Sequence, residues 1–322
     1  MSSALRRHIG AAFLSVLIAL AGSAHAGEAM QLDVAGGTLH GTLEWPDDAT
    51  AAVLILAGSG PTDRDGNVAS LAGKNNSLRY LAEALGMQGI ASLRVDKRLV
   101  GASTIKGQTE RDLRFDTYVG DARLWLDTLQ EKTALPTFVL GHSEGALVAT
   151  LAATDRDVSG LIIVAGAGQP AGDLILEQMQ TRLPPRLMTQ AQRIVTALED
   201  GRGVNDTPAA LAALFRPSVQ PYLISWFRHD PAEALSTVRS PILLTYGTTD
   251  LQVLPAAGRR LNAANPRSSL HVIEGMNHVL KAASGPMAAQ LASYGDPTLP
   301  IHPELVAQIM SFVTQHAPSR SQ

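Results

Sequence analysis

Short apolar runs that end in glycine or polar residues constrain the fold of this chain more than any other feature. The runs are AAVLILAGSG (51–60), GIASLRVDKR (89–98), PTFVLGHSEG (136–145), GLIIVAGAG (160–168) and PILLTYGTTD (241–250). Such runs are typical of strands buried on both faces of a sheet. Helical patterns alternate with them, as in residues 115–132. The alternation predicts an α/β fold with a mostly parallel central sheet flanked by helices.

The composition limits the classes of function. With 45% hydrophobic and 17% charged residues, the 322-residue chain has enough apolar side chains for a sizeable core. Its formal charge is −3, and neither sign gathers into long runs. We therefore expect a small-molecule partner and no nucleic acid. The absence of cysteine excludes disulfides, thiolate metal sites and a cysteine nucleophile. The oligomeric state stays open.

Residues 1–26 have the pattern of a secretory signal peptide. Arg6 and Arg7 give a basic start, an apolar stretch follows, and Ala24-His25-Ala26 matches a small-x-small cleavage site. The apolar stretch is short for a membrane-spanning helix. We therefore expect a periplasmic or secreted protein that begins near Gly27 after cleavage and keeps no stable membrane anchor.

The strand-helix rhythm breaks over residues 169–235, where only helical patterns occur. We interpret this block as a helical cap inserted before the acid-bearing strand, between a first core part (27–168) and a second core part (236–322). Large apolar side chains of the cap are candidates for a substrate pocket, although such residues at helical spacing more often belong to a core. They are Met179, Met188, Phe215, Tyr222 and Trp226.

The segment Gly141-His142-Ser143-Glu144-Gly145 fits the G-x-S-x-G pattern of a nucleophile elbow. The pattern places a serine on a sharp turn between a strand and a helix, where flanking glycines avoid steric overlap. Here an apolar run precedes Ser143 and a small-residue helical pattern follows it. This context favours Ser143 as a nucleophile over a serine in an ordinary tight turn.

A serine nucleophile needs a base, and the base needs a carboxylate that orients it. On a sheet of this kind the chain order is serine, acid, histidine. Asp250 ends the run 241–250, and His278 follows the strand pattern 268–275. Both therefore lie at the predicted sheet edge of Ser143. Of the nine histidines, His278 alone has this position and order.

The reaction also needs two backbone N–H groups that stabilise the oxyanion. Glu144, directly after the nucleophile, is expected to supply one. The loop AGSGP after the run 51–56 is expected to supply the other, from Ser59. By itself that loop would be an ordinary glycine turn.

From about residue 51 onward the chain resembles the α/β-hydrolase superfamily, and within it the exported esterase and serine-aminopeptidase-like branch. The resemblance rests on AGSGPTDRDGN, RVDKRLVGAS, GHSEG, DPAEALSTVRSPILLTYGTTDLQV and GMNH. It implies the same roles for Ser59, Ser143, Glu144, Asp250 and His278. One departure is Leu99, where relatives of this type usually have glycine.

Two charged loops lie at the same predicted edge, Asp63-Arg64-Asp65 and Asp96-Lys97-Arg98. They could orient a polar substrate, but charges near a buried edge need partners. We therefore expect them to pair with each other and brace the oxyanion loop, with Asp65 and Arg98 as the pair to test.

The segment GAGQPAG (166–172) resembles a dinucleotide fingerprint but has the wrong glycine spacing, and no acid-ended strand follows it. No P-loop or H-E-x-x-H pattern occurs in the sequence. No cofactor and no catalytic metal are expected.

The sequence thus predicts a carboxylesterase-like serine hydrolase that forms an acyl-enzyme and acts on a small-molecule ester. Two alternatives stay open. One is an aminopeptidase or peptidase with the same three residues, for which cap acids such as Glu177 and Asp230 could bind a substrate amine. The other is an inactive hydrolase-fold binding protein.

Overall fold

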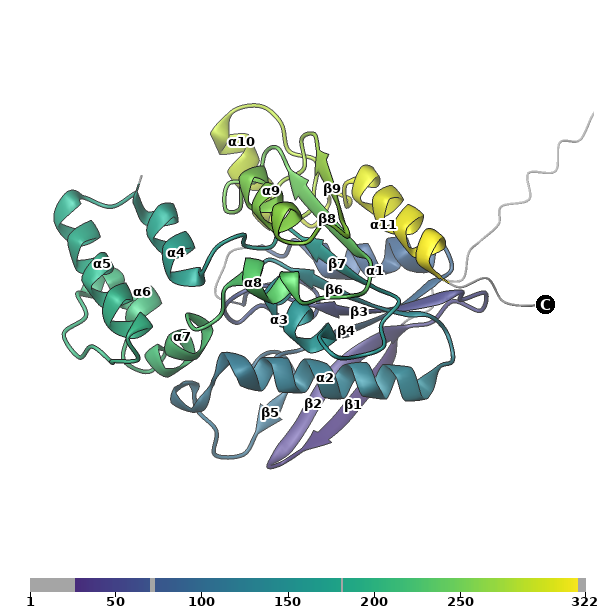
Figure 1. The fold of residues 1–322 in the computed structure, drawn as a ribbon, viewed down its shortest axis with the longest axis horizontal. Helices are drawn as coiled ribbons and strands as arrows, with labels where there is room; N and C mark the ends of the chain where they lie inside the picture. Colours follow the sequence, from purple (N-terminus) through teal and green to yellow (C-terminus); the bar gives the residue numbers. More distant parts are fainter. Residues whose placement is uncertain (1–26, 70–72, 181, 318–322) are drawn as a thin grey trace, which may run out of the picture.

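A nine-stranded, mostly parallel sheet forms the centre of the molecule in the computed structural model, which describes residues 27–69, 73–180 and 182–317 (Figure 1). The strands are β1 (Glu28–Val34), β2 (Gly37–Glu44), β3 (Ala51–Leu56), β4 (Ile90–Val95), β5 (Thr104–Ile105), β6 (Thr137–His142), β7 (Gly160–Val164), β8 (Ile242–Gly247) and β9 (Ser268–Ile273). The predicted signal peptide, residues 1–26, lies outside the described residues.

The sheet has the strand order β1-β2-β4-β3-β6-β7-β8-β9, and β5 pairs with β2. β1, β2 and β4 pair antiparallel, whereas every pair from β4 to β9 is parallel. The predicted α/β class is therefore confirmed. Every residue of β3, β4, β6, β7 and β8 is buried, as their continuous apolar sequences predict.

The longer helices are α1 (Ser77–Gly86), α2 (Phe115–Lys132), α3 (Glu144–Ala153), α4 (Ala171–Gln180), α5 (Pro185–Glu199), α9 (Pro255–Ala264) and α11 (Pro303–His316). The shorter ones are η1 (Glu110–Asp112), η2 (Ala209–Leu211), α6 (Ala212–Phe215), α7 (Gln220–Trp226), α8 (Pro231–Ser236), α10 (Met287–Ala292) and η3 (Ser293–Gly295). No helix among the described residues is long and apolar enough to cross a membrane.

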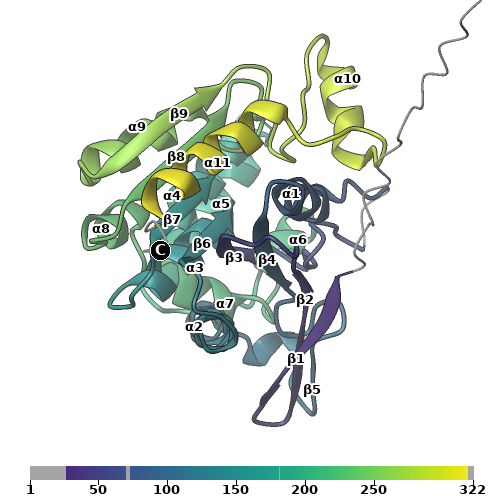
Figure 2. The same cartoon turned by 90° about the vertical axis from the view of Figure 1, so that its right-hand side faces the viewer.

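Helices cover both faces of the sheet (Figure 2). α1 and α11 contact each other and cover one face of the sheet. They pack against it in a core around Phe138, Leu243 and Leu305. α2, α3, α8 and α9 pack on the other face, where Trp125 and Tyr246 are among the largest fully buried side chains. The sheet is thus enclosed between two helical layers.

The chain leaves the sheet after β7 and returns at β8, the neighbouring strand. The elements described between these strands are all helices, from α4 to α8. In Figure 1, α4 to α7 stand to the left of the sheet and its flanking helices. α7 contacts both α2 and α5, so this helical block is attached to the core.

Candidate active site

The turn at Ser143 joins β6 to α3 with a strained backbone. Ser143 has φ 56° and ψ −120°, a combination that non-glycine residues rarely adopt. A Cβ atom at Gly141 would overlap the backbone of Gly145 and Ala146, and one at Gly145 would overlap the carbonyl oxygens of Leu56 and Ala57. Both flanking positions therefore accept only glycine without a backbone shift.

Asp250 and His278 come from the two strands that follow the helical block. Asp250 lies after β8 and His278 after β9, and the carboxyl ends of these parallel strands lie at the same edge as that of β6. His278 Nδ1 lies 2.8 Å from Asp250 Oδ2, and both residues are buried. Residues distant in sequence thus form one hydrogen-bonded pair at this edge.

The Asp250 carboxylate is fixed from both sides. Its Oδ1 accepts hydrogen bonds from the amides of Gln252 (2.7 Å) and Val253 (2.9 Å). Burial by itself raises the pKa of the Asp250 carboxyl, but the His278 ring and the two amides together hold that pKa below its usual value. The ionised carboxylate therefore orients the imidazole with Nδ1–H toward Asp250 and leaves Nε2 free.

His142 connects the elbow to His278. Its Nε2–H donates to the His278 carbonyl oxygen at 2.8 Å, and the two ring centroids lie 4.9 Å apart. Burial first and the neighbouring His278 second lower the pKa of His142 to about 3. His142 is therefore a neutral hydrogen-bond donor that holds the His278 loop beside Ser143. Among the described residues, no hydrogen bond joins the Ser143 hydroxyl to the His278 ring.

The loop after β3 lies directly against the elbow. A Cβ atom at Gly58 would be 3.1 Å from Ser143 Cβ, so the backbone of this loop approaches the serine closely. Ser59 follows and is exposed. Glu144 is the first residue of α3, and a first-turn amide has no acceptor within its helix. The amides of Ser59 and Glu144 thus belong to segments that flank Ser143.

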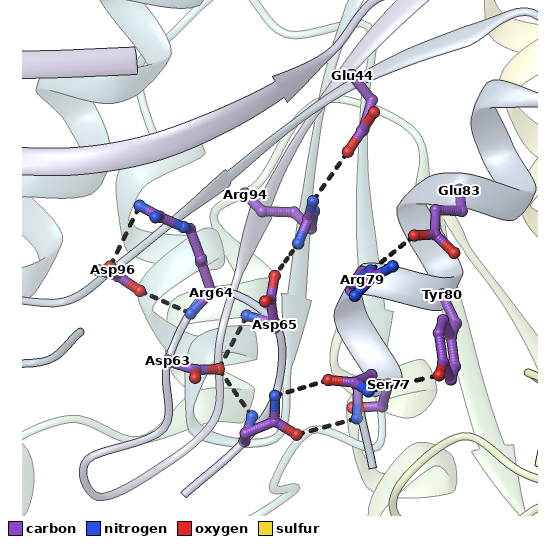
Figure 3. A network of polar contacts seen from close by, with 12 residues as sticks. Glu44, Asp63, Arg64, Asp65, Ser77, Arg79, Tyr80, Glu83, Arg94 and Asp96 are labelled. Atoms are coloured by element: carbon purple, nitrogen blue, oxygen red, sulfur yellow. Dashed lines mark hydrogen bonds and ion pairs between the residues drawn. The ribbon is translucent and has the colours of Figure 1, made fainter. Parts of the chain in front are cut away.

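The two charged loops pair with each other through Arg64 and Asp96, as predicted, and Asp65 adds a partner that the sequence did not indicate (Figure 3). The Asp96 carboxylate accepts the Arg64 amide at 2.8 Å and lies 3.3 Å from the Arg64 guanidinium. Asp65 pairs with Arg94 of β4, which also binds Glu44 at 2.9 Å. Loop bracing is therefore present, through these contacts.

The predicted pair Asp65–Arg98 is wrong. Arg98 instead binds Asp121 of α2 through two hydrogen bonds, of 2.6 and 2.8 Å. Arg94 of β4 lies beside β2 and binds Asp65 and Glu44, whereas Arg98 lies in the loop after β4 and binds α2 in the helix layer on the other face. Leu99 has φ 62°, the left-handed conformation that glycine adopts most easily, so a glycine would fit this turn with less strain.

The five cap side chains predicted for the pocket pack mainly into the core. Met179, Phe215 and Tyr222 are buried in it, and Met188 and Trp226 pack against it. A cavity of about 250 Å³ lies between α4 and the loop after Asp250, and one of about 860 Å³ lies at the opposite ends of β3, β6 and β7. None of the five lines either cavity. Their role in substrate binding stays a prediction.

Tyr294 is a site neighbour that the sequence did not reveal. It belongs to η3, in the segment between His278 and α11, and burial first and the Asp250 charge second raise its pKa to about 12. α10, just before it, has no buried residue, and its six residues are too few to show a helical period in the sequence. The proximity of Tyr294 to Asp250 arises from this tertiary return of the chain.

A parallel sheet enclosed by helices, with a glycine-flanked serine elbow at its carboxyl edge, defines an α/β-hydrolase. A family model described as serine aminopeptidase, S33, matches residues 71–282. The chain belongs to this family. The predicted resemblance to the α/β-hydrolase superfamily is thereby confirmed.

Individual relatives include esterases. Esterase EstD of Thermotoga maritima is 27% identical over 207 residues, which are 63% of this chain and 47% of that protein. The chain thus spans about half the length of this curated relative. The solved structure of Est1E from Butyrivibrio proteoclasticus with ferulic acid has a TM-score of 0.60 at 19% identity, covering 89% of this chain and 99% of that one.

A peptidase has the same fold. The structure of proline iminopeptidase from Mycobacterium smegmatis has a TM-score of 0.56 at 16% identity, covering 90% of this chain and 98% of that chain. At such identities the likeness shows the fold alone. The curated relative is named an esterase, and the fold is common to esterases and a peptidase.

Proposed function

We propose that this protein is a serine hydrolase that cleaves carboxylic esters of small molecules through an acyl-enzyme. The observation that carries the proposal is the 2.8 Å contact between His278 Nδ1 and Asp250 Oδ2 at the sheet edge of the strained Ser143 elbow. Serine, carboxylate and imidazole, which follow one another in this order along the chain, are the groups that acyl transfer requires. The esterase relative supports the ester as substrate.

The proposed reaction has two halves. Ser143 Oγ attacks the ester carbonyl carbon while His278 Nε2 accepts the hydroxyl proton, and the amides of Ser59 and Glu144 stabilise the oxyanion. The tetrahedral intermediate expels the alcohol, which receives the proton from His278. A water molecule, deprotonated by His278, then attacks the acyl group, and the acid leaves as Ser143 regains its proton. Asp250 stays ionised throughout.

The proposal requires a short rearrangement at the serine. We propose that rotation of the Ser143 side chain about χ1 brings the hydroxyl to the His278 ring, whose loop the His142 hydrogen bond holds beside the elbow. Catalytic hydrogen bonds are often loose in an unliganded site and tighten with substrate.

A fluorophosphonate probe tests the nucleophile. We expect the wild-type protein to be labelled and to hydrolyse p-nitrophenyl esters, and Ser143→Ala to lose both properties while it unfolds at the same temperature. The control is Ser159→Ala, a serine beside β7 outside the site. A folded wild-type protein that neither reacts with the probe nor hydrolyses any ester would contradict the proposal and favour a binding protein.

Amide cleavage is the second candidate, because the matching family model is described as a serine aminopeptidase. Both substrates would use the same site, so only relative rates separate them. We expect p-nitrophenyl esters to be hydrolysed faster than aminoacyl anilides, and esters of graded acyl length to define the acyl preference. Faster cleavage of the anilides would replace esterase by peptidase.

We also propose that the protein is exported, on the basis of the signal pattern in residues 1–26. Amino-terminal sequencing of protein recovered outside the cytoplasm is expected to begin near Gly27. Recovery of the full-length chain from the cytoplasm alone would contradict export.

A further inference from the structure

Lys97 contacts the peptide group that carries a proposed oxyanion donor. Its ammonium group donates a hydrogen bond to the carbonyl oxygen of Gly58. That carbonyl and the amide of Ser59 belong to one peptide group, which is trans, so the C=O and the N–H point in opposite directions. Because Lys97 binds the Gly58 carbonyl oxygen, the Ser59 N–H of the same peptide group points away from Lys97.

The same ammonium group reaches the second oxyanion segment. Lys97 Nζ lies 3.6 Å from Glu144 Oε1, and the side chains of Lys97 and Glu144 are 10% and 1% exposed. Neither carboxylate oxygen of Glu144 has a hydrogen-bond partner among the described residues. Lys97 thus lies between the loop after β3 and the first residue of α3.

Aromatic side chains enclose this ion pair. Lys97 Nζ lies 5.6 Å from the ring centroid of Tyr118 in α2, which packs against Tyr222 of α7 at a centroid distance of 5.5 Å. Burial lowers the pKa of Lys97 and raises that of Glu144. Burying an ion pair is often less favourable than burying apolar side chains of the same volume. Stability alone therefore does not explain a lysine at this position.

We propose that Lys97 is a positioning residue for the oxyanion hole: it fixes the Gly58–Ser59 peptide so that its N–H serves the oxyanion, and joins that loop to Glu144. This inference rests on the proposed serine-hydrolase function and deepens it. A positive charge on the carbonyl oxygen also polarises the peptide group, which makes its N–H a stronger donor. Removing Lys97 should weaken transition-state binding more than substrate binding.

The test compares two variants that differ only at Lys97. Lys97→Met alone would leave the Glu144 carboxylate buried without a partner, so the reference is Glu144→Gln and the test variant is Lys97→Met/Glu144→Gln. We expect kcat for a p-nitrophenyl ester to be at least about 10-fold lower in the double variant than in the reference, since loss of a whole oxyanion donor costs about 10²–10³-fold. KM should change by less than about 3-fold.

A boronic acid, which forms a tetrahedral adduct with serine, provides a second readout. Its affinity should fall in proportion to kcat. Lys106→Met, an exposed lysine, is the matched control and should leave kcat, KM and boronate affinity unchanged. Equal kcat and equal boronate affinity in the reference and the double variant would overturn the proposal, as would a fall in kcat without a fall in boronate affinity.

If the double variant Lys97→Met/Glu144→Gln does not fold, Lys97→Gln in the Glu144→Gln background takes its place in the test. Glutamine is one atom shorter than lysine and carries no charge, so both the contact with the Gly58 carbonyl oxygen and its polarisation are weakened. A kcat lower than in the reference at unchanged KM supports the proposal, and a kcat equal to the reference overturns it. Failure of the proposed function gives a different result, namely a wild-type protein without probe labelling or ester turnover. A labelled, active wild type with insensitive variants refutes only the role of Lys97.

Discussion

Single residues at the elbow show how closely the backbone constrains this site. Ser143 adopts positive φ although it carries a side chain, and such strain persists only where neighbouring structure holds it. Gly141 and Gly145 provide the space for the turn, and Gly58 allows the oxyanion loop to approach it. The G-x-S-x-G spacing predicts this turn because sterics alone determine which residues fit.

Gly141→Ala is expected to lower the free energy of unfolding by about 3 kcal/mol or more, because the added Cβ meets immovable backbone atoms of Gly145 and Ala146. The matched control is Gly120→Ala in α2, where no atom lies within 4 Å of the added Cβ. That control should raise the free energy of unfolding by up to about 1 kcal/mol. Urea denaturation measures both, and similar changes in the two variants would contradict the steric argument.

At the scale of elements, α7 of the helical block between β7 and β8 is attached to the core through α2 and the preceding η1. The Phe115 and Trp226 rings stack with centroids 5.9 Å apart at an interplanar angle of 7°. Arg216 and Ser218 both bind Glu110 of η1. The buried hydroxyl of Ser225 accepts the Phe115 amide at 2.7 Å, which satisfies a first-turn donor of α2.

Ser225→Ala should therefore destabilise the protein by about 1–2 kcal/mol, because the buried Phe115 amide loses its acceptor. Ser236→Ala at the end of α8 is the control, since that exposed hydroxyl bonds only the local Glu233 carbonyl among its described contacts. Its effect should stay within about 0.5 kcal/mol. Chemical denaturation at one pH measures the free energy of unfolding of both variants. An equal loss in Ser225→Ala and Ser236→Ala would show that the contact between α2 and α7 contributes little to stability.

The sequence predicted elements better than it predicted contacts between them. Apolar runs and helical patterns depend on local spacing, so the strands and the elbow could be predicted from the sequence. The partner of Arg98 could not, because it depends on how α2 lies against the sheet. Tyr294 and α10 were not predicted, since the six residues of α10 are too few to show a helical period and Tyr294 reaches Asp250 through a tertiary return of the chain.

For the whole molecule, several ionisable side chains are buried along one sheet edge, and their titration affects global stability. His142 is the clearest case, because its pKa in the folded protein is about 3, against an ordinary value of 6.5. Between these values the unfolded chain binds a proton that the folded protein excludes. The stability due to neutral His142 is therefore complete above pH 6.5 and declines as the pH falls toward 3.

Between pH 8 and pH 5 this group alone should reduce the free energy of unfolding by about 2 kcal/mol. His142→Gln, which retains an N–H donor for the His278 carbonyl, should lose less stability over the same range. Denaturation curves at pH 8, 6.5 and 5 measure the difference between the two proteins. The Asp250 pKa is lowered, so the stability that the ionised Asp250 contributes is lost only at pH values below this range. Its titration therefore does not mask the effect of His142. An equal change in the free energy of unfolding with pH in the wild-type protein and in His142→Gln would contradict the neutral state of His142.

The departure of the chain after β7 and its return at the adjacent β8 have an evolutionary consequence. Because the two attachment points are neighbours, the excursion between them can be lengthened, shortened or exchanged with little effect on the strands that carry Ser143, Asp250 and His278. Divergence toward new substrates could then proceed within one contiguous stretch of the gene. If this stretch binds substrate, as the sequence predicts, a chimaera that carries it from a homologue is expected to take on the selectivity of the donor and to keep the reaction chemistry of the host.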